Sequence, residues 1–252
     1  MMADAGAVRR PVELRDGGWE QPPASAGEPG LWLVRAEAFS PVVARLADSV
    51  LDGAEKRRAA ALRVAGDRGT YLAGHVGLRL LLGAYLGVPP VDVPLRRSPC
   101  PLCGQPHGRP AVPGNPVHFS LSRSGGLCLL AFARVPVGVD IEAVPALDVA
   151  EEVGACLHPR EVAELSGLRE VGKPAVFARV WARKEAYLKG LGTGLGRSMS
   201  LDYLGTAPDG VAKVPGWTIG DVPVDDGYAA AVAVQDAGPV AGTVSGRSAS
   251  SP

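Results

Sequence analysis

The chain has 252 residues, of which 46% are hydrophobic and 21% are charged, so it is long enough and apolar enough to bury a core. Lysine and arginine together number 26 and equal the 26 acidic residues, which excludes a chain that coats nucleic acid through net positive charge. The longest charge-free apolar stretch, Leu80 to Val91, contains two prolines and is shorter than the ~18 residues of a membrane span, so a cytoplasmic protein is expected.

Both ends of the chain are rich in Gly, Pro, Ala and Ser, without an apolar period, and residues 1–28 and 237–252 are predicted to be flexible tails. A first half is predicted over residues 29–136. Its segments, in chain order, are a buried strand at 31–34, helices at 41–51, 54–64 and 68–87, a Pro- and Cys-rich loop at 89–116, and a hairpin of 118–122 with 127–133.

A second half is predicted over residues 137–236 with a similar order of elements. Its segments are a strand at 137–141, helices at 148–156, 159–168 and 174–190, and a strand at 228–234. The long helical patterns of the two halves align at an offset of 106 residues, which places Arg79 over Glu185. We therefore expect an α+β fold of two similar halves related by a pseudo-twofold axis, with a ligand site in the cleft between them. We also expect a monomer, because an internal duplication supplies the interface that a homodimer supplies elsewhere.

Two carboxylates end the strand that opens the second half. Gly138-Val-Asp-Ile-Glu142 places Asp140 and Glu142 two residues apart, so both project from one face of the strand. Paired carboxylates suit Mg²⁺, which usually also keeps waters and substrate phosphates as ligands. Taken alone, the pair favours an ordinary solvated strand end over a metal site.

The segment from Trp181 to Leu195 combines apolar and charged side chains on the long helix of the second half. On a helix, Trp181, Glu185, Leu188 and Lys189 share a stripe, with Lys184 at its flank. Trp181 and Leu188 can anchor this helix while Glu185 and Lys189 face a site. The alternative is an ordinary exposed Glu-Lys pair, which contributes only a few tenths of a kcal/mol.

Two further clusters carry possible ligand chemistry. Arg63 and Arg79 belong to a basic group in the first half, where guanidinium groups could hold phosphate or could simply form a solvated helix face. Cys100-Pro-Leu-Cys103, followed by His107, permits a zinc site. Only one such cysteine pair is present, and Cys128 and Cys156 stand alone, so the zinc question stays open.

Read together, these segments resemble the two-domain, surfactin-type 4'-phosphopantetheinyl transferases. The resemblance covers roughly residues 30 to 235. The matching motifs, in the family's order, are Gly108-Arg-Pro110, Phe119-Ser-Leu-Ser-Arg-Ser124, Gly138-Val-Asp-Ile-Glu142 and Trp181 with Lys-Glu-Ala and Lys189. The last two motifs are specific in combination, and the first two are supportive.

The resemblance implies Mg²⁺-dependent transfer of 4'-phosphopantetheine from coenzyme A to a serine of an apo acyl or peptidyl carrier protein, leaving 3',5'-ADP. It implies that Asp140, Glu142 and Glu185 hold the metal. Glu185 would also help to deprotonate the serine, and Lys189 would protonate the departing phosphate. The resemblance implies that coenzyme A is held by basic side chains, namely Arg63, Arg79, Arg123, Lys184 and Lys189.

One departure from the family pattern concerns the turn that usually reads Ser-His-Ser, which here reads Ser122-Arg-Ser124. Arg123 can still pair with phosphate, but it has a longer reach than histidine. This departure keeps open a second reading, a catalytically silent module that binds coenzyme A or a carrier protein. A third reading is a Mg²⁺-dependent phosphohydrolase, in which a water molecule takes the place of the serine.

Overall fold

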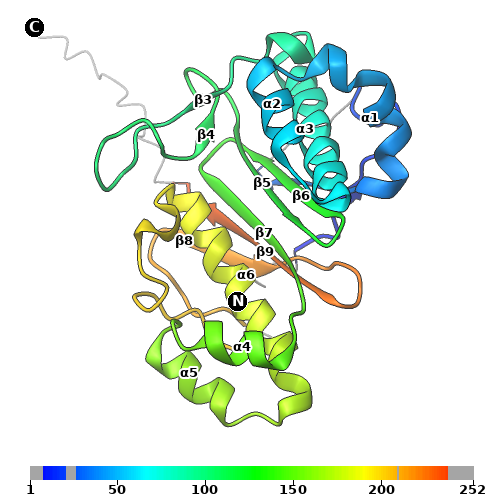
Figure 1. Cartoon of the computed structure of the whole chain (residues 1–252). Helices are drawn as coiled ribbons and strands as arrows, with labels where there is room; N and C mark the ends of the chain where they lie inside the picture. The colour runs from blue at the N-terminus through cyan, green and yellow to red at the C-terminus, as the bar shows by residue number, and fades with distance from the viewer. Residues whose placement is uncertain (1–7, 21–26, 209, 238–252) are drawn as a thin grey trace, which may run out of the picture.

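The computed structural model describes residues 8–20, 27–208 and 210–237, and it mixes helices with sheets as the α+β class requires (Figure 1). The strands are β1 (Val12–Glu13), β2 (Gly30–Arg35), β3 (Arg96–Arg97), β4 (Pro110–Ala111), β5 (His118–Ser124), β6 (Leu127–Ala133), β7 (Val137–Ala143), β8 (Trp217–Asp221) and β9 (Tyr228–Gln235). The helices are α1 (Ala36–Val50), α2 (Gly53–Ala61), α3 (Ala65–Leu86), α4 (Leu147–Gly154), α5 (Pro159–Ser166) and α6 (Lys173–Leu191), with 3₁₀ turns η1 (Pro90–Asp92), η2 (Glu170–Gly172) and η3 (Gly194–Gly196).

The strands form a first sheet of order β1-β2-β6-β5, a second sheet of order β7-β9-β8, and the separate pair β3-β4. Alternation along β2 explains how the first sheet is buried on both faces. Trp32 and Val34 pack into the core beneath α1 and α3, whereas Leu31 and Leu33 pack into a second apolar cluster that includes residues of β7 and β9. The two sheets therefore meet through an apolar layer, and the edge strands β5 and β7 run beside each other (Figure 1).

Helix α6 covers the face of the second sheet that is turned away from this layer (Figure 1). Small residues make a close approach possible, since Ala182 and Ala186 of the helix pack against Ala231 and Ala233 of β9. At Gly138 of β7, a Cβ atom would collide with the backbone of α6 at Ala186 and Gly190. The helix and the strand thus touch backbone to backbone at this glycine.

The predicted elements are confirmed in type and order, with shifted ends. Helix α1 begins at Ala36, five residues before its predicted start at 41, and it contains Pro41. A proline removes one helical N–H and leaves the carbonyl of Glu37 without its usual donor. The hydroxyl of Ser40 donates to that carbonyl at 2.7 Å, which lets the helix continue through the proline. Strand β8 was not predicted, because its side chains are only half-buried and give no clear alternation.

The predicted N-terminal tail is wrong for part of its length. Val12 and Glu13 form the short strand β1, which pairs in parallel with β2, and the next side chain, Leu14, is buried in the core. A strand of two residues is too short to show a period in the sequence, so it could not be predicted. The strand is ordered because it pairs with β2. Residues 1–7, 21–26 and the predicted C-terminal tail from 238 lie outside the described residues.

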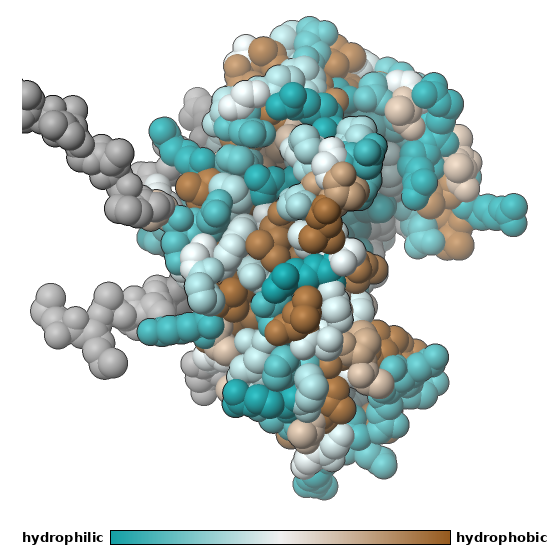
Figure 2. Space-filling model, turned by 90° about the vertical axis from the view of Figure 1, so that its left-hand side faces the viewer, coloured by the Kyte–Doolittle hydropathy of each residue, from teal (hydrophilic) through white to brown (hydrophobic). Residues whose placement is uncertain are grey.

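The surface on one side of the molecule mixes hydrophobic and hydrophilic residues. Figure 2 shows the face that lies on the β3–β4 side, where hydrophobic residues are interspersed among hydrophilic ones. Among the described residues, no helix is both long enough and apolar enough to cross a membrane.

Candidate active site at the junction of β5, β7 and α6

The acidic residues of β7 are placed by the alternation of that strand. Val139 and Ile141 turn into the apolar layer between the sheets, so Asp140 and Glu142 project from the opposite face, on which α6 lies. The spacing of two residues predicts this shared face. The carboxylates of Asp140 and Glu142 consequently meet side chains from α6 and from the neighbouring edge strand β5.

Asp140 is the most deeply buried acid of this group, with 1% of its surface exposed. Its Oδ1 accepts hydrogen bonds from the Ser122 hydroxyl at 2.6 Å and from the Lys189 ammonium at 2.5 Å. Its Oδ2 is buried and has no partner among the described residues. Burial raises the pKa of Asp140, although the charge of Lys189 opposes that rise. The orphaned oxygen is an unused acceptor in a place where an unpaired polar atom is costly.

Glu142 and Glu185 complete the acidic group. Burial, followed by the charge of Asp140, raises the pKa of Glu142 to about 7, and Glu185 adds to the rise. Burial also raises the pKa of Glu185, with the charge of Asp140 adding to it and that of Lys189 opposing it. The charge of Asp140 therefore disfavours the ionised forms of both Glu142 and Glu185 in a partly desolvated space.

Lys189 is the basic member of the site and comes from the last turn of α6. In addition to its bond with Asp140, its Nζ donates to Ser122 Oγ at 2.9 Å. Its side chain is 29% exposed, so the ammonium is both paired and open to solvent. Glu185 and Lys189 lie one turn apart on α6, and the charge of Lys189 lowers the pKa of Glu185 against the effect of burial.

The donor set fits a divalent cation. Mg²⁺ prefers carboxylate oxygens, and here three carboxylates share a site in which Asp140 Oδ2 lacks a partner. The carboxylates are nevertheless not closed into a ligand shell. Among the described residues, a compact set of potential metal ligands is found elsewhere, at Cys100, Cys103 and His107. Each of these residues offers one ligand atom, and the three atoms lie within 4.8 Å of one another. A metal held by these acids would take its remaining ligands from substrate or water.

Comparison with known proteins identifies the family to which this chain belongs. Residues 136–231, which contain β7 and α6, match the 4'-phosphopantetheinyl transferase superfamily. The chain is 33% identical over 172 residues to the 4'-phosphopantetheinyl transferase HetI of Nostoc sp., an alignment that covers 66% of this chain and 71% of the relative. The chain belongs to the 4'-phosphopantetheinyl transferase superfamily.

Other members of the superfamily are similar over shorter stretches. The 4'-phosphopantetheinyl transferase Sfp of Bacillus subtilis is 32% identical, over 39% of this chain and 43% of its own length. The transferase gsp of Aneurinibacillus migulanus is 28% identical, over 49% of this chain and 48% of its own length. The chain thus aligns with about half the length of each of these two relatives. The shared family makes this chain a transferase enzyme.

Lys184 was expected to contact coenzyme A, but it lies away from the acidic group. Its side chain is buried, and its Nζ pairs with the buried carboxylate of Glu161 at 2.8 Å. The same Nζ donates to the carbonyls of Met199 and Asp202. Adjacent residues on a helix point about 100° apart, so Lys184 turns away when Glu185 faces the site. Its donors are consumed in holding α5 and the segment after α6.

Arg79 was also expected to hold coenzyme A, and the structure uses it differently. The side chain is 2% exposed, and its guanidinium donates to the carboxylates of Glu55 at 2.6 Å and Asp52 at 2.7 Å. It also donates to the carbonyls of Pro90 and Val91. These partners occupy the guanidinium, so Arg79 fastens α2 and η1 to α3. Arg63, in contrast, is exposed between α2 and α3.

Arg123, which stands where the family usually has histidine, is exposed on β5. Its guanidinium lies over the ring of Tyr71 of α3, 5.0 Å from the ring centroid. The stacking directs the side chain across α3 and leaves its hydrogen-bond donors toward solvent. Arg123 is therefore on the same strand as Ser122 but on the opposite face from Asp140.

The serines of β5 are functional neighbours that the sequence reasoning missed. Ser122 binds Asp140, and Ser124 donates to Glu142 at 3.3 Å while accepting from the backbone N–H of Ala143. Ser120 accepts from the N–H of Val139. The sequence Ser-Leu-Ser-Arg-Ser could have indicated this arrangement, because serines at every second position of a strand line one face of it.

A surface pocket of ≈ 570 Å³ lies next to this site. Its walls come from the end of β2, the β5–β6 turn and the β8–β9 connection, and they include Arg35, Gly125, Asp225 and Tyr228. Tyr228 is paired with Ala143 and its hydroxyl donates to the carbonyl of Gly125. The pocket therefore borders the first and second sheets one residue beyond Glu142 and Ser124.

Proposed function

We propose that this chain transfers the 4'-phosphopantetheine group from coenzyme A to a serine hydroxyl of an apo acyl or peptidyl carrier protein, releasing 3',5'-ADP. The observation that carries the proposal is the buried, unpartnered Oδ2 of Asp140 beside the Lys189 ammonium, within a chain of this superfamily. A binding module without catalysis has no use for three desolvated acids next to a lysine.

Asp140, Glu142 and Glu185 would hold Mg²⁺. The bound ion would neutralise charge on the pyrophosphate of coenzyme A during transfer. Two features of the chain support this assignment. Burial and mutual repulsion disfavour the ionised forms of these acids, so a cation relieves a cost that the fold itself creates. Ser122 and Lys189 already fix Oδ1 of Asp140, which orients the free Oδ2.

Proton transfers fall to Glu185 and Lys189. The serine oxygen of the carrier protein attacks the phosphorus that bears the pantetheine arm, and the bond from that phosphorus to the bridging oxygen breaks. Glu185 accepts the serine proton, directly or through one water. Lys189 gives a proton to the leaving phosphate oxygen of 3',5'-ADP. Its partial exposure supports access to that oxygen.

Coenzyme A binding is assigned to Arg63, Arg123 and Lys189. Arg63 is exposed just before α3, and the exposed Arg123 of β5 lies over Tyr71 of the same helix. Guanidinium groups pair strongly with phosphate, and Arg63 would hold the 3'-phosphate. Arg79 and Lys184 are left out of this assignment, because their donors are satisfied by buried carboxylates and carbonyls.

We further propose that residues 29–136 and 137–236 are two halves related by a pseudo-twofold axis. The order of elements supports this, since each half opens on a strand and packs a long helix, α3 or α6, against its sheet. The apolar layer that both sheets share supports a single monomeric unit. A cytoplasmic location stays a prediction from the sequence.

Mass spectrometry of an apo carrier protein tests the function directly. The carrier is incubated with this chain, coenzyme A and Mg²⁺, and the mass of one phosphopantetheine group should be added at its serine. Appearance of 3',5'-ADP in equal amount should accompany the change. An unmodified carrier in the presence of bound coenzyme A would instead favour the silent module, and hydrolysed coenzyme A would favour a phosphohydrolase.

A further inference from the structure

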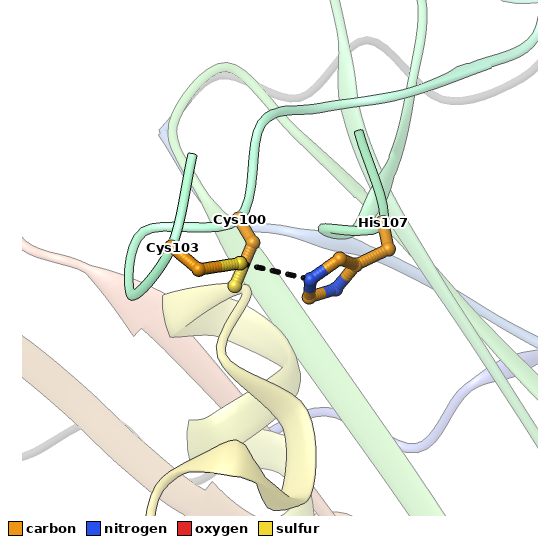
Figure 3. Close-up of side chains that lie close together, drawn as sticks. All are labelled: Cys100, Cys103 and His107. Carbon is orange, nitrogen blue, oxygen red and sulfur yellow. Dashed lines mark hydrogen bonds between the residues drawn. The ribbon is translucent and has the colours of Figure 1, made fainter. Parts of the chain in front are cut away.

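A second group of metal-ligand side chains lies outside the acidic site, in the segment between β3 and β4. We call residues 98–109 the Cys loop. Its Cys100, Cys103 and His107 each offer one ligand atom within 4.8 Å of the others, and Cys103 Sγ lies 3.0 Å from His107 Nε2. Figure 3 shows the three side chains pointing toward one another from the two arms of this loop. We propose that Cys100, Cys103 and His107 bind one zinc ion.

Backbone hydrogen bonds hold the two arms of the loop together. The N–H of Gly104 donates to the carbonyl of Cys100 at 2.8 Å, and Gly104 has a φ of +74°, which closes the turn after Cys103. The carbonyl of Gln105 accepts hydrogen bonds from the N–H groups of Cys100 at 2.7 Å and of His107 at 2.8 Å. The residues that carry a sulfur and an imidazole are thus tied to the same peptide group.

The ligand types select the metal. Two thiolates and one imidazole suit zinc, which takes Cys and His in tetrahedral sites, whereas Mg²⁺ and Ca²⁺ prefer oxygen. Among the described residues, no fourth Cys, His, Asp or Glu joins the group. A water molecule therefore completes the tetrahedron, on the exposed side formed by Cys103 and His107.

Most of the Cys loop is exposed to solvent and buries little apolar surface. Residues 101–107 are all exposed, and Cys100 is the buried exception at the start of the turn. A loop without a core of its own gains order from a metal crosslink, because binding free energy then becomes folding free energy. Zinc would supply the crosslink between its two arms.

The ordered loop has a task, since it lies on the C-terminal end of α6. Arg109, at the end of the loop, donates to the carbonyl of Gly190 at 2.6 Å. Pro101 also lies against Gly192, and Leu102 lies against Gly196 of η3. Gly190 directly follows Lys189, so the zinc loop would brace the helix turn that carries the lysine of the active site.

Metal content of the full-length chain tests the proposal without carrier protein or coenzyme A, so its result is independent of the proposed transferase function. Protein from a zinc-supplemented culture, freed of loose metal by gel filtration, should hold one zinc ion per chain by elemental analysis. Cys103→Ser and His107→Ala should each weaken zinc binding by more than about 100-fold, since even groups one step removed from a metal contribute 10–100-fold. Cys156→Ser, at an exposed cysteine between α4 and α5, is the matched control and should keep the ion.

Cobalt substitution provides a spectroscopic readout. Co²⁺ in the wild-type site should give sulfur-to-metal charge-transfer absorption and strong tetrahedral d–d bands, and both should weaken in Cys103→Ser. Zinc-free wild-type protein should also be cleaved faster by protease within residues 98–109. A zinc content near zero in folded wild-type protein would overturn the proposal. So would a Cys100–Cys103 disulfide found by mass spectrometry in protein purified without air.

Discussion

Nζ of Lys189 lies 2.5 Å from Oδ1 of Asp140, and this ion pair joins the last turn of α6 to the middle of β7. The pair is unequal in burial, because Asp140 is 1% exposed and the lysine side chain is 29% exposed. Lys189 and Ser122 thus hold one oxygen of the carboxylate, and its other oxygen is buried without a partner among the described residues. This geometry makes Asp140 the residue on which the proposed chemistry depends most.

Replacing Asp140 by Ala should lower turnover by a factor on the order of 10², as for other groups that stabilise charge in a transition state. The measurement is the rate of carrier modification at saturating coenzyme A, with circular dichroism to verify the fold. Glu152→Ala, at an exposed acid of α4, should leave the rate unchanged. Carrier modification at the full rate in Asp140→Ala protein would be inconsistent with the proposed mechanism.

Removal of divalent cations should stop the transfer reversibly. We expect EDTA to abolish carrier modification and added Mg²⁺ or Mn²⁺ to restore it, since carboxylate oxygens prefer these ions. An unchanged rate in EDTA would show that the three acids work without a metal.

Arg63→Ala should raise the KM for coenzyme A by about tenfold while changing kcat little, which is the pattern of an interaction lost equally in ground and transition states. Dephospho-coenzyme A lacks the 3'-phosphate, so its KM should hardly respond. Arg57→Ala, at another exposed arginine on α2, provides the matched control. If both substrates responded equally, Arg63 would have to act elsewhere in the site.

Arg79→Ala should lower the free energy of unfolding. The change would leave the buried carboxylate of Glu55 without its guanidinium partner, and losing one member of a buried ion pair costs roughly 3–5 kcal/mol. Urea unfolding followed by circular dichroism measures this loss. A stable Arg79→Ala protein with a specific defect in coenzyme A binding would return this arginine to the ligand site.

Cys128 should be unreactive in the folded protein. Burial raises the pKa of this thiol to about 12, and its Sγ donates to the carbonyl of Thr70 at 3.3 Å. At pH 8 the thiolate fraction would therefore be on the order of 10⁻⁴. The folded state binds the thiol proton more tightly than the unfolded state does, which stabilises the fold. This stabilisation is complete below the ordinary pKa of 9.0 and is lost as pH rises toward 12.

Thiol labelling followed by mass mapping checks this expectation. The exposed Cys156 should be labelled quickly in native protein, and Cys128 only after unfolding. Fast labelling of Cys128 at pH 8 would mean that β6 and α3 separate far more often than their packing indicates.

The sequence is informative where periodicity alone determines which way a side chain points. Asp140 and Glu142 could be assigned to one strand face because a strand alternates, and Glu185 and Lys189 to one helix stripe because four residues make about one turn. The order of elements followed from the same periods. These rules require no knowledge of what lies opposite.

The sequence does not predict the role of a side chain when that role depends on which residue packs against it in the fold. Lys184 and Glu185 are neighbours on one helix, yet Lys184 is withdrawn into the interior by Glu161, an acid whose position depends on how α5 packs against α6. Arg79 is likewise defined by Asp52 and Glu55 of α2. A basic residue in a family motif can thus be a phosphate ligand or a structural brace, and only the fold distinguishes them.

The contact at Gly138 leaves no space for a side chain at that position. A methyl group there would overlap the carbonyl oxygen of Ala186 and the nitrogen of Gly190, so β7 and α6 would have to move apart. The helix that carries Glu185 and Lys189 would then shift away from the strand that carries Asp140. Position 138 thus limits the geometry of the site, although it holds no side chain and takes part in no chemistry.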